Sequence, residues 1–156
     1  MQDRPRPYFD GQSDFYFIGL AERAASYSPD PKTKVGAVIV NELGRLVVYG
    51  FNDFPIKIAQ TPERWERPLK YKYVCHAEQS AIYNAASAGR MVGSCSMFIH
   101  GLPPCIECVK AIIQSGITRV ICPSASSLLP HQQHWIADLG FAQTLLAEAK
   151  ISVSIY

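Results

Sequence analysis

The sequence contains neither a run of like charges nor a long apolar run. Only 18% of its 156 residues are charged, and the formal net charge is +2. Without a block of basic residues we expect no general electrostatic grip on a nucleic-acid backbone, so a small substrate is favoured. No segment is apolar for long enough to cross a membrane, and residues 1–7 lack the apolar core of a signal peptide. We therefore expect a cytoplasmic protein.

Neither an internal repeat nor a low-complexity tract divides the chain. Its length suits one domain with a sizeable core, so we expect residues 1–156 to form a single domain with a loose Pro-rich lead at 1–12. The cysteine count, five, is odd. In a reducing compartment we expect Cys75, Cys95 and Cys122 to remain thiols, without a disulfide.

The residues that carry chemistry lie between 76 and 108. His-Ala-Glu at 76–78 is followed, after a strand-like run, by Pro-Cys-Ile-Glu-Cys at 104–108. One imidazole and two thiolates are the ligand set of a zinc site whose fourth position is open. A carboxylate two residues after the His can lie beside the metal and move protons between water and a substrate. This pattern is the signature of the zinc-dependent nucleobase deaminases.

A structural zinc site is the alternative interpretation of these residues. In that case Cys75, Cys95 or another His would supply a fourth protein ligand and close the site. Ordinary buried cysteines are a second alternative, since a Cys-x-x-Cys pair alone is weak evidence. The proline before the pair and Glu78 upstream favour catalysis, and Cys75 is expected to pack away from the metal.

Apolar periodicity predicts an α/β fold. The expected elements are a helix at about 14–27 capped by Ser13, strands at 35–40 and 46–51 in a hairpin covered on both faces, a helix at 76–88, a strand at 96–100, a helix at 105–116, a strand at 117–122, a helix at 132–150 and a strand at 151–156. This order requires a mixed five-stranded sheet covered by helices on both faces. Helical crossovers make its last three strands parallel.

Residues 52–73 form a long segment without clear periodicity. A loop of this length in a compact domain is usually functional, and this one ends beside His76. We therefore expect its cations to meet a substrate phosphate, with neutralisation by neighbouring glutamates in a solvated lid as the alternative. The cations concerned are Arg64, Arg67, Lys70 and Lys72.

Four segments resemble, in the same order, those of the deoxycytidylate deaminases. They are Asp30–Val40, Gly50–Pro55, Lys70–Glu78 and Pro104–Lys110. The resemblance covers roughly residues 13–122 and includes a long insertion before His-Ala-Glu that tRNA-adenosine and cytosine deaminases usually lack. It implies the three-layer α/β/α cytidine-deaminase-like fold, hydrolysis of dCMP to dUMP and ammonia, and a homo-oligomer, commonly a hexamer. In many members dCTP activates and dTTP inhibits.

The resemblance also implies roles for individual residues. His76, Cys105 and Cys108 correspond to the ligands of one Zn²⁺ per chain, and Glu78 corresponds to the proton shuttle. The backbone N–H of Ala77 and the side chain of Asn52 correspond to pyrimidine or sugar contacts, and Pro104 is expected to border the same pocket. For Asn52 the alternative is a turn residue that closes the second strand.

Two segments differ from that family. Pro103 stands where the family typically carries an aromatic residue, and residues 123–130 lack the family's charged and tyrosine-bearing pattern. Another free nucleobase, nucleoside or amino-heterocycle is therefore an alternative substrate for the same chemistry. A DNA- or RNA-editing deaminase is a further alternative, in which Trp65, Tyr71 and Tyr73 would form a stacking groove. A regulatory module with an inactive site is the third, and the intact Glu78 argues against it.

Overall fold

The structure is a computed structural model that describes residues 11–128 and 130–156. Most of the expected N-terminal lead, residues 1–10, lies outside the described residues. Helix α1 spans Gly11–Ser26, so the prediction that a helix begins near Asp14 with Ser13 as its cap is wrong by one turn. The carboxylate of Asp14 forms an ion pair with Arg119, which ties the first turns of α1 to the sheet.

Five strands form one mixed sheet in the order β2-β1-β3-β4-β5. Strand β1 pairs antiparallel with both β2 and β3, whereas the β3–β4 and β4–β5 pairs are parallel. The predicted parallel arrangement of the last three strands is confirmed. Their bounds are Gly36–Val40 for β1, Leu46–Phe51 for β2, Ser96–His100 for β3, Arg119–Cys122 for β4 and Ser152–Ile155 for β5.

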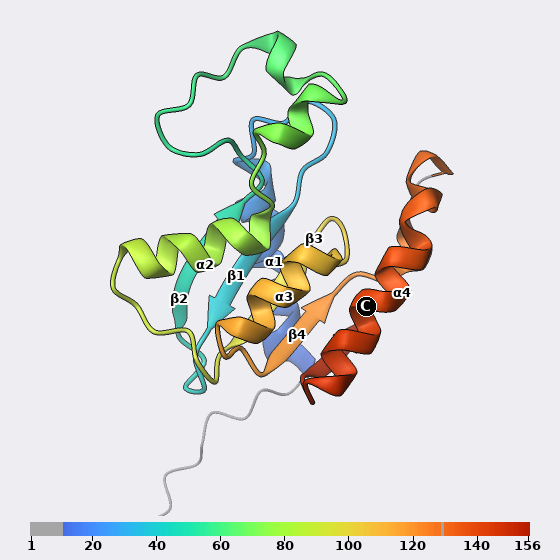
Figure 1. Ribbon diagram of the computed structural model, residues 1–156. Helices are drawn as coiled ribbons and strands as arrows, with labels where there is room; N and C mark the ends of the chain where they lie inside the picture. Colours follow the sequence, from blue (N-terminus) through green and yellow to red (C-terminus); the bar gives the residue numbers. More distant parts are fainter. Residues whose placement is uncertain (1–10, 129) are drawn as a thin grey trace, which may run out of the picture.

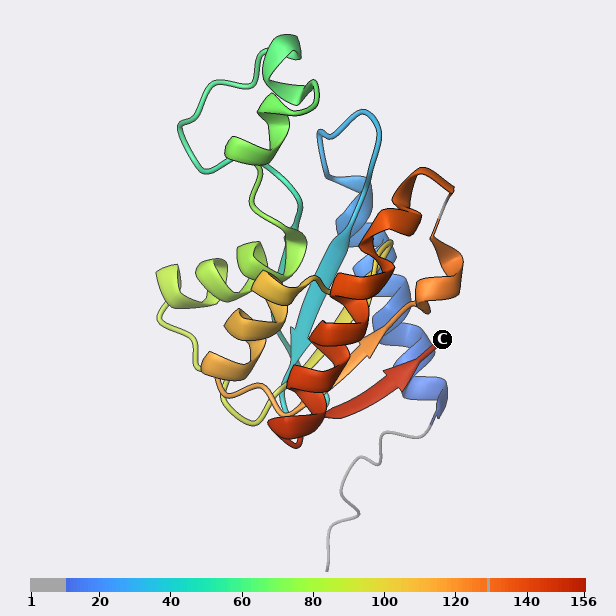
Figure 2. The same cartoon turned by 45° about the vertical axis from the view of Figure 1, so that its right-hand side comes forward.

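Helices cover both faces of the sheet (Figures 1 and 2). Helix α1 covers one face, and the other carries α2 (Ala77–Ser87), α3 (Ile106–Gln114) and α4 (Ile136–Glu148). Alternate residues of each inner strand point to opposite faces. Ala37 and Ile39 of β1 thus join the core under α2, α3 and α4, whereas Val38 and Val40 pack against α1. The predicted α/β/α architecture is confirmed.

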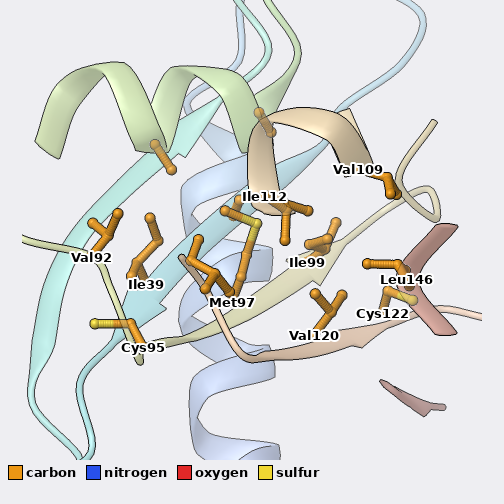
Figure 3. Close-up of a cluster of buried hydrophobic side chains, with 14 of the residues drawn as sticks. Ile39, Val92, Cys95, Met97, Ile99, Val109, Ile112, Val120, Cys122 and Leu146 are labelled. Atoms are coloured by element: carbon orange, nitrogen blue, oxygen red, sulfur yellow. The ribbon is translucent and has the colours of Figure 1, made fainter. Parts of the chain in front are cut away.

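The larger of the two cores lies between the sheet and the three helices (Figure 3). Met97 and Ile99 of β3 meet Val109 and Ile112 of α3 there, and all four side chains are fully buried. Burial of side chains of this size stabilises the fold by about 1.5–3 kcal/mol each. Helix α3 is therefore held firmly on the central strand, and its N-terminus is fixed with it.

Strand β2 and the last helix differ from expectation. The hairpin is not covered on both faces, because β2 is an edge strand and its Leu46 and Tyr49 are 46% and 47% exposed. The segment expected to begin the last helix is a 3₁₀ helix, Pro130–Trp135, and α4 starts only at Ile136. The helical spacing of Trp135, Leu139, Ala142, Leu146 and Ala149 predicts a buried stripe for this helix, but Ala149 is exposed. Within the described ranges, no helix has the length and apolar character that a membrane crossing requires.

Candidate active site

The three expected metal ligands lie at the start of two neighbouring helices. His76 is the N-cap residue of α2, Cys105 is the N-cap residue of α3, and Cys108 lies in the first turn of α3. Both helices begin at the end of the molecule that carries the insertion at 52–73, drawn in green in Figure 1. Their unpaired N–H groups and positive dipole ends favour thiolates at this place.

The ligand atoms form a compact group. The Nδ1 atom of His76 is 3.4 Å from the Sγ atoms of both Cys105 and Cys108, and all three atoms lie within 4.8 Å of one another. Tetrahedral zinc with Zn–S bonds of about 2.3 Å and Zn–N bonds of about 2.0–2.1 Å would place S and N about 3.5 Å apart. The two S–N distances therefore fit a zinc ion.

Protons compete with a metal for these three atoms. The hydrogen bond from the Cys108 thiol lowers the pKa of Cys105 to about 4, and the same hydrogen bond together with burial raises the pKa of Cys108. Hydrogen bonding with Cys105 raises the pKa of His76. A metal ion that binds all three atoms must displace these protons, so its affinity decreases as pH falls.

Glu78 lies beside the ligand group and is 3% exposed. Burial raises the pKa of its carboxyl group, and the nearby His76 opposes part of this rise. A carboxyl group whose pKa is closer to neutrality accepts and releases protons more readily near pH 7. Its position on the first turn of α2, two residues after a ligand, gives it the place that a proton shuttle needs.

A cavity of about 250 Å³ opens beside His76 and Glu78. It is lined by Thr33, Val35, Asn52, Arg67, Lys70, Tyr71, Val74, His76, Ala77, Glu78, Leu102, Pro103, Cys105 and Trp135. Mostly apolar walls with a few converging polar groups are typical of small-molecule sites.

The structure brings four of the expected substrate contacts to this cavity and leaves three away from it: Arg64, Pro104 and Lys72, of which Lys72 is exposed. Asn52, Ala77, Arg67 and Lys70 line it. The Arg64 guanidinium instead lies 4.8 Å from the ring centre of Tyr73 and donates a hydrogen bond of 2.8 Å to the Ala59 carbonyl. The ring of Pro104 is buried and borders a separate small hollow next to Leu139 and Leu146.

Asn52 has a structural role in addition to its place on the cavity. Its Oδ1 accepts a hydrogen bond of 2.8 Å from the Val35 N–H, and its Nδ2 donates to Asp30 Oδ2 and to the Thr33 carbonyl. Both amide protons are thus used within the protein. The side chain can therefore accept one further hydrogen bond, through the second lone pair of Oδ1.

The insertion packs its own aromatic residues. Trp65 is buried and stacks on Phe54 at a ring-centre distance of 4.1 Å, and Tyr73 lies 5.3 Å from Phe54. The stacking groove considered for nucleic acid is therefore not formed, because two of its three rings are used inside the insertion. The third, Tyr71, is half-exposed and lines the cavity.

Other cavity residues were not foreseen as substrate contacts. Leu102 was missed although it lies just before the cysteine motif, beside Pro103, which the family comparison had already singled out and which also lines the cavity. Trp135 was expected in the buried stripe of the last helix, but it is only partly buried and lines the cavity. No local sequence pattern predicts that Trp135 lies at the cavity, because the position of this side chain depends on how α4 packs beside α3.

Cys75 and Cys95 do not join the ligand group within the part of the chain that the structure describes. Cys75 pairs with Asp53 through a hydrogen bond of 2.8 Å from its N–H and lines a separate hollow that includes Phe54 and Tyr83. Cys95 is buried in the core. Neither of these cysteines supplies the fourth ligand that a closed structural site would need.

Comparison with known proteins agrees with this geometry. The family profile described as "Cytidine and deoxycytidylate deaminase zinc-binding region" matches residues 12–124. Deoxycytidylate deaminases of Mus musculus and Homo sapiens are 44% and 43% identical over 112 residues, which are 68% of this chain and 61% of theirs. An "uncharacterized deaminase in luxG 3'region" of Aliivibrio fischeri is 33% identical over 138 residues, covering 88% of this chain and 89% of that protein.

The fold is similar to that of a dCMP deaminase from the cyanophage S-TIM5, solved with dCMP and dUMP. The TM-score is 0.75 at 21% sequence identity, and the alignment covers 96% of this chain and 100% of that one. Since the matched profile spans most of the chain and includes all the residues of the ligand group, the chain belongs to the cytidine and deoxycytidylate deaminase zinc-binding family.

Proposed function

We propose that the protein is a zinc-dependent hydrolytic deaminase that converts dCMP and water to dUMP and ammonia. The observation that carries this proposal is the buried Glu78 beside a His-Cys-Cys group that fits zinc, at the wall of a small cavity. The mouse and human relatives that bear the name deoxycytidylate deaminase support the choice of substrate. The chain spans 61% of the length of these relatives. The activity of the whole protein is therefore part of the proposal.

The protein side chains would divide the proton transfers and the binding between them. Zinc held by His76, Cys105 and Cys108 would polarise a water molecule so that it can act as a nucleophile near neutral pH. Glu78 takes a proton from the attacking water, protonates the ring nitrogen, and delivers a proton to the amine that leaves from C4. Ammonia departs as the C4 carbonyl of dUMP forms, which balances the reaction.

The cavity offers the substrate several contacts. The Ala77 N–H at the start of α2 and the free lone pair of Asn52 Oδ1 suit the polar edge of a base or sugar. Arg67 is exposed at the cavity and lies 5.9 Å from the ring centre of Tyr71, and no salt bridge in the described residues neutralises it. We assign the phosphate to Arg67, whereas Arg64 and Pro104 do not reach the cavity.

Ammonia release from a panel of ring amines tests the substrate. We expect dCMP to be preferred over deoxycytidine, cytosine and guanine. An Arg67→Met variant should lower kcat/KM for dCMP roughly 10- to 100-fold, since a charge-assisted contact contributes about 1.5–3 kcal/mol, and should leave the value for deoxycytidine unchanged. Preference of the wild-type enzyme for an unphosphorylated amine would contradict the dCMP assignment. Addition of dCTP or dTTP to the same assay tests regulation, which would appear as a change in the rate of ammonia release from dCMP.

We also propose that the protein is a homo-oligomer with β2 at a subunit contact. Tyr27 and Tyr49 are 54% and 47% exposed and, with Phe51, form an aromatic group along this edge strand. Exposed apolar groups on an unpaired strand edge favour association. Light scattering at micromolar concentration should give a mass of several chains, and Tyr49→Asp should lower it. Phe141→Asp, at an exposed position of α4, is the matched control. A strictly monomeric wild-type mass would contradict the proposal.

A further inference from the structure

Three charged side chains are buried in the part of the chain that the structure describes: Asp30, Lys70 and Glu78. All three belong to the surroundings of one cavity. The proton chemistry accounts for Glu78, but it does not account for the other two. Burying an ion pair costs several kcal/mol per ion unless its geometry and hydrogen bonds are good, so a pair that is kept beside a cavity points to a role there.

Asp30 has every acceptor position of its carboxylate in use. Its Oδ1 accepts hydrogen bonds from the N–H groups of Lys32, at 2.9 Å, and Thr33, at 3.1 Å. Its Oδ2 accepts a hydrogen bond of 3.0 Å from Asn52 Nδ2 and forms the ion pair with Lys70 Nζ. Asp30 is fully buried and does not line the cavity, so any effect it has on a substrate passes through Lys70 or Asn52.

The ion pair joins three segments that form walls of the cavity. Asp30 lies in the loop between α1 and β1 that also supplies Thr33 and Val35, and Asn52 follows the end of β2. Lys70 lies on the short 3₁₀ helix Leu69–Lys72 of the insertion, beyond the N-terminus of α2 (Figure 1). One carboxylate therefore fixes the ammonium and the amide relative to each other.

The charge balance determines what Lys70 can bind. An ammonium has three N–H donors, and its ion-pair partner among the described residues is Asp30. Since Lys70 also lines the cavity, it can direct a donor toward a ligand. The Asp30–Lys70 pair is neutral overall, however, so it adds no net charge to attract a phosphate dianion. Arg67, for which residues 11–128 and 130–156 provide no ion-pair partner, lines the same cavity and supplies that charge.

We propose that Lys70 donates a hydrogen bond to a neutral oxygen of the substrate, on the sugar or on the ring, and that Asp30 is the positioning residue that holds Lys70 and Asn52 for this contact. This inference rests on the proposed function, because it assumes a nucleotide in the cavity. It assigns phosphate binding and recognition of the neutral part of the substrate to different cations of the same insertion.

The double variant Asp30→Asn/Lys70→Met separates recognition from stability. Asp30→Asn alone leaves Lys70 buried without its counter-ion and should lower Tm by roughly 10 °C. The double variant removes both charges and retains an acceptor for the Lys32 and Thr33 N–H groups. Asn52 Nδ2 loses its acceptor on residue 30 but keeps the Thr33 carbonyl, so the Tm and zinc content of the double variant should recover most of the loss. Its KM for dCMP should nevertheless stay raised about tenfold, with a smaller change in kcat, because the donor is gone.

Competitive inhibition constants of dUMP and deoxyuridine, measured against dCMP, identify the part of the ligand that is contacted. The double variant should raise both constants by a similar factor of about ten, whereas Arg67→Met should raise only that of dUMP. Lys72→Met, at an exposed lysine on the same 3₁₀ helix, is the control and should change neither.

Two results would overturn the inference. Recovery of wild-type KM together with Tm in the double variant would make the ion pair structural only. A rise confined to dUMP would place Lys70 on the phosphate. Failure of the proposed function looks different, because the wild-type enzyme would then release no ammonia from dCMP.

Discussion

Glu78→Gln should lose nearly all turnover of dCMP, at least about 10³-fold in kcat, while it keeps its zinc. Glutamine has nearly the same shape as glutamate but can neither take a proton from water nor deliver one to the ring and the leaving amine. General acid–base catalysis contributes about 10²–10⁴-fold for one positioned group, and Glu78 is assigned both roles. The change also removes a carboxyl group whose pKa burial raises, so no buried charge is left unpaired. Steady-state kinetics with metal analysis of the same preparation measures the effect.

Glu107→Gln is a matched control for this result. Glu107 also follows a ligand, Cys105, by two residues on the first turn of a helix, but its side chain is exposed and forms a 2.6 Å ion pair with Lys110. Its loss should leave kcat unchanged. Cys105→Ser should lose zinc and turnover together, which distinguishes loss of the metal from loss of the shuttle. Wild-type turnover in a zinc-loaded Glu78→Gln protein would contradict the assigned role.

The sequence was sufficient to predict the inner sheet because burial on both faces leaves a clear pattern. Ala37 to Val40 is an unbroken apolar run, and each of its residues is buried under a helix on one face or the other. Strand β3 has the predicted bounds for the same reason. Strand β2 has an equally apolar sequence but lies at the edge. An apolar run alone does not reveal whether the residues that bury the strand belong to the same chain.

The ligand group could also be located from local sequence, whereas the walls of the cavity could not. His76, Cys105 and Cys108 are set by helix starts, and a proline or a change of periodicity marks such starts. The direction of Arg64 depends on stacking with Tyr73, and the burial of Lys70 depends on Asp30, which lies far away in the sequence. Contacts of this kind follow from the packing of the insertion against the rest of the chain, and hydrophobic periodicity does not predict them.

Gly50→Ala should destabilise the protein by about 3 kcal/mol and reduce zinc occupancy, although it adds only one methyl group. Gly50 lies in β2 opposite Ala37, where α2 crosses the strand. A Cβ atom there would lie 2.3 Å from the Ala81 nitrogen and 2.7 Å from the Ala77 carbonyl oxygen. Both are backbone atoms, so no side chain can rotate away and α2 itself must shift.

Because α2 carries Glu78 and is capped by His76, that shift would displace both from the thiols of α3. Thermal unfolding should show Tm lower by roughly 10 °C, and metal analysis should show less zinc bound at equal protein concentration. Gly140→Ala is the matched control: it lies in α4 with no atom within 4 Å of the added methyl group, so it should leave zinc unchanged and raise stability by about 0.5–1 kcal/mol through helix propensity. Equal stability of the Gly50→Ala and wild-type proteins would mean that α2 does not approach β2 this closely.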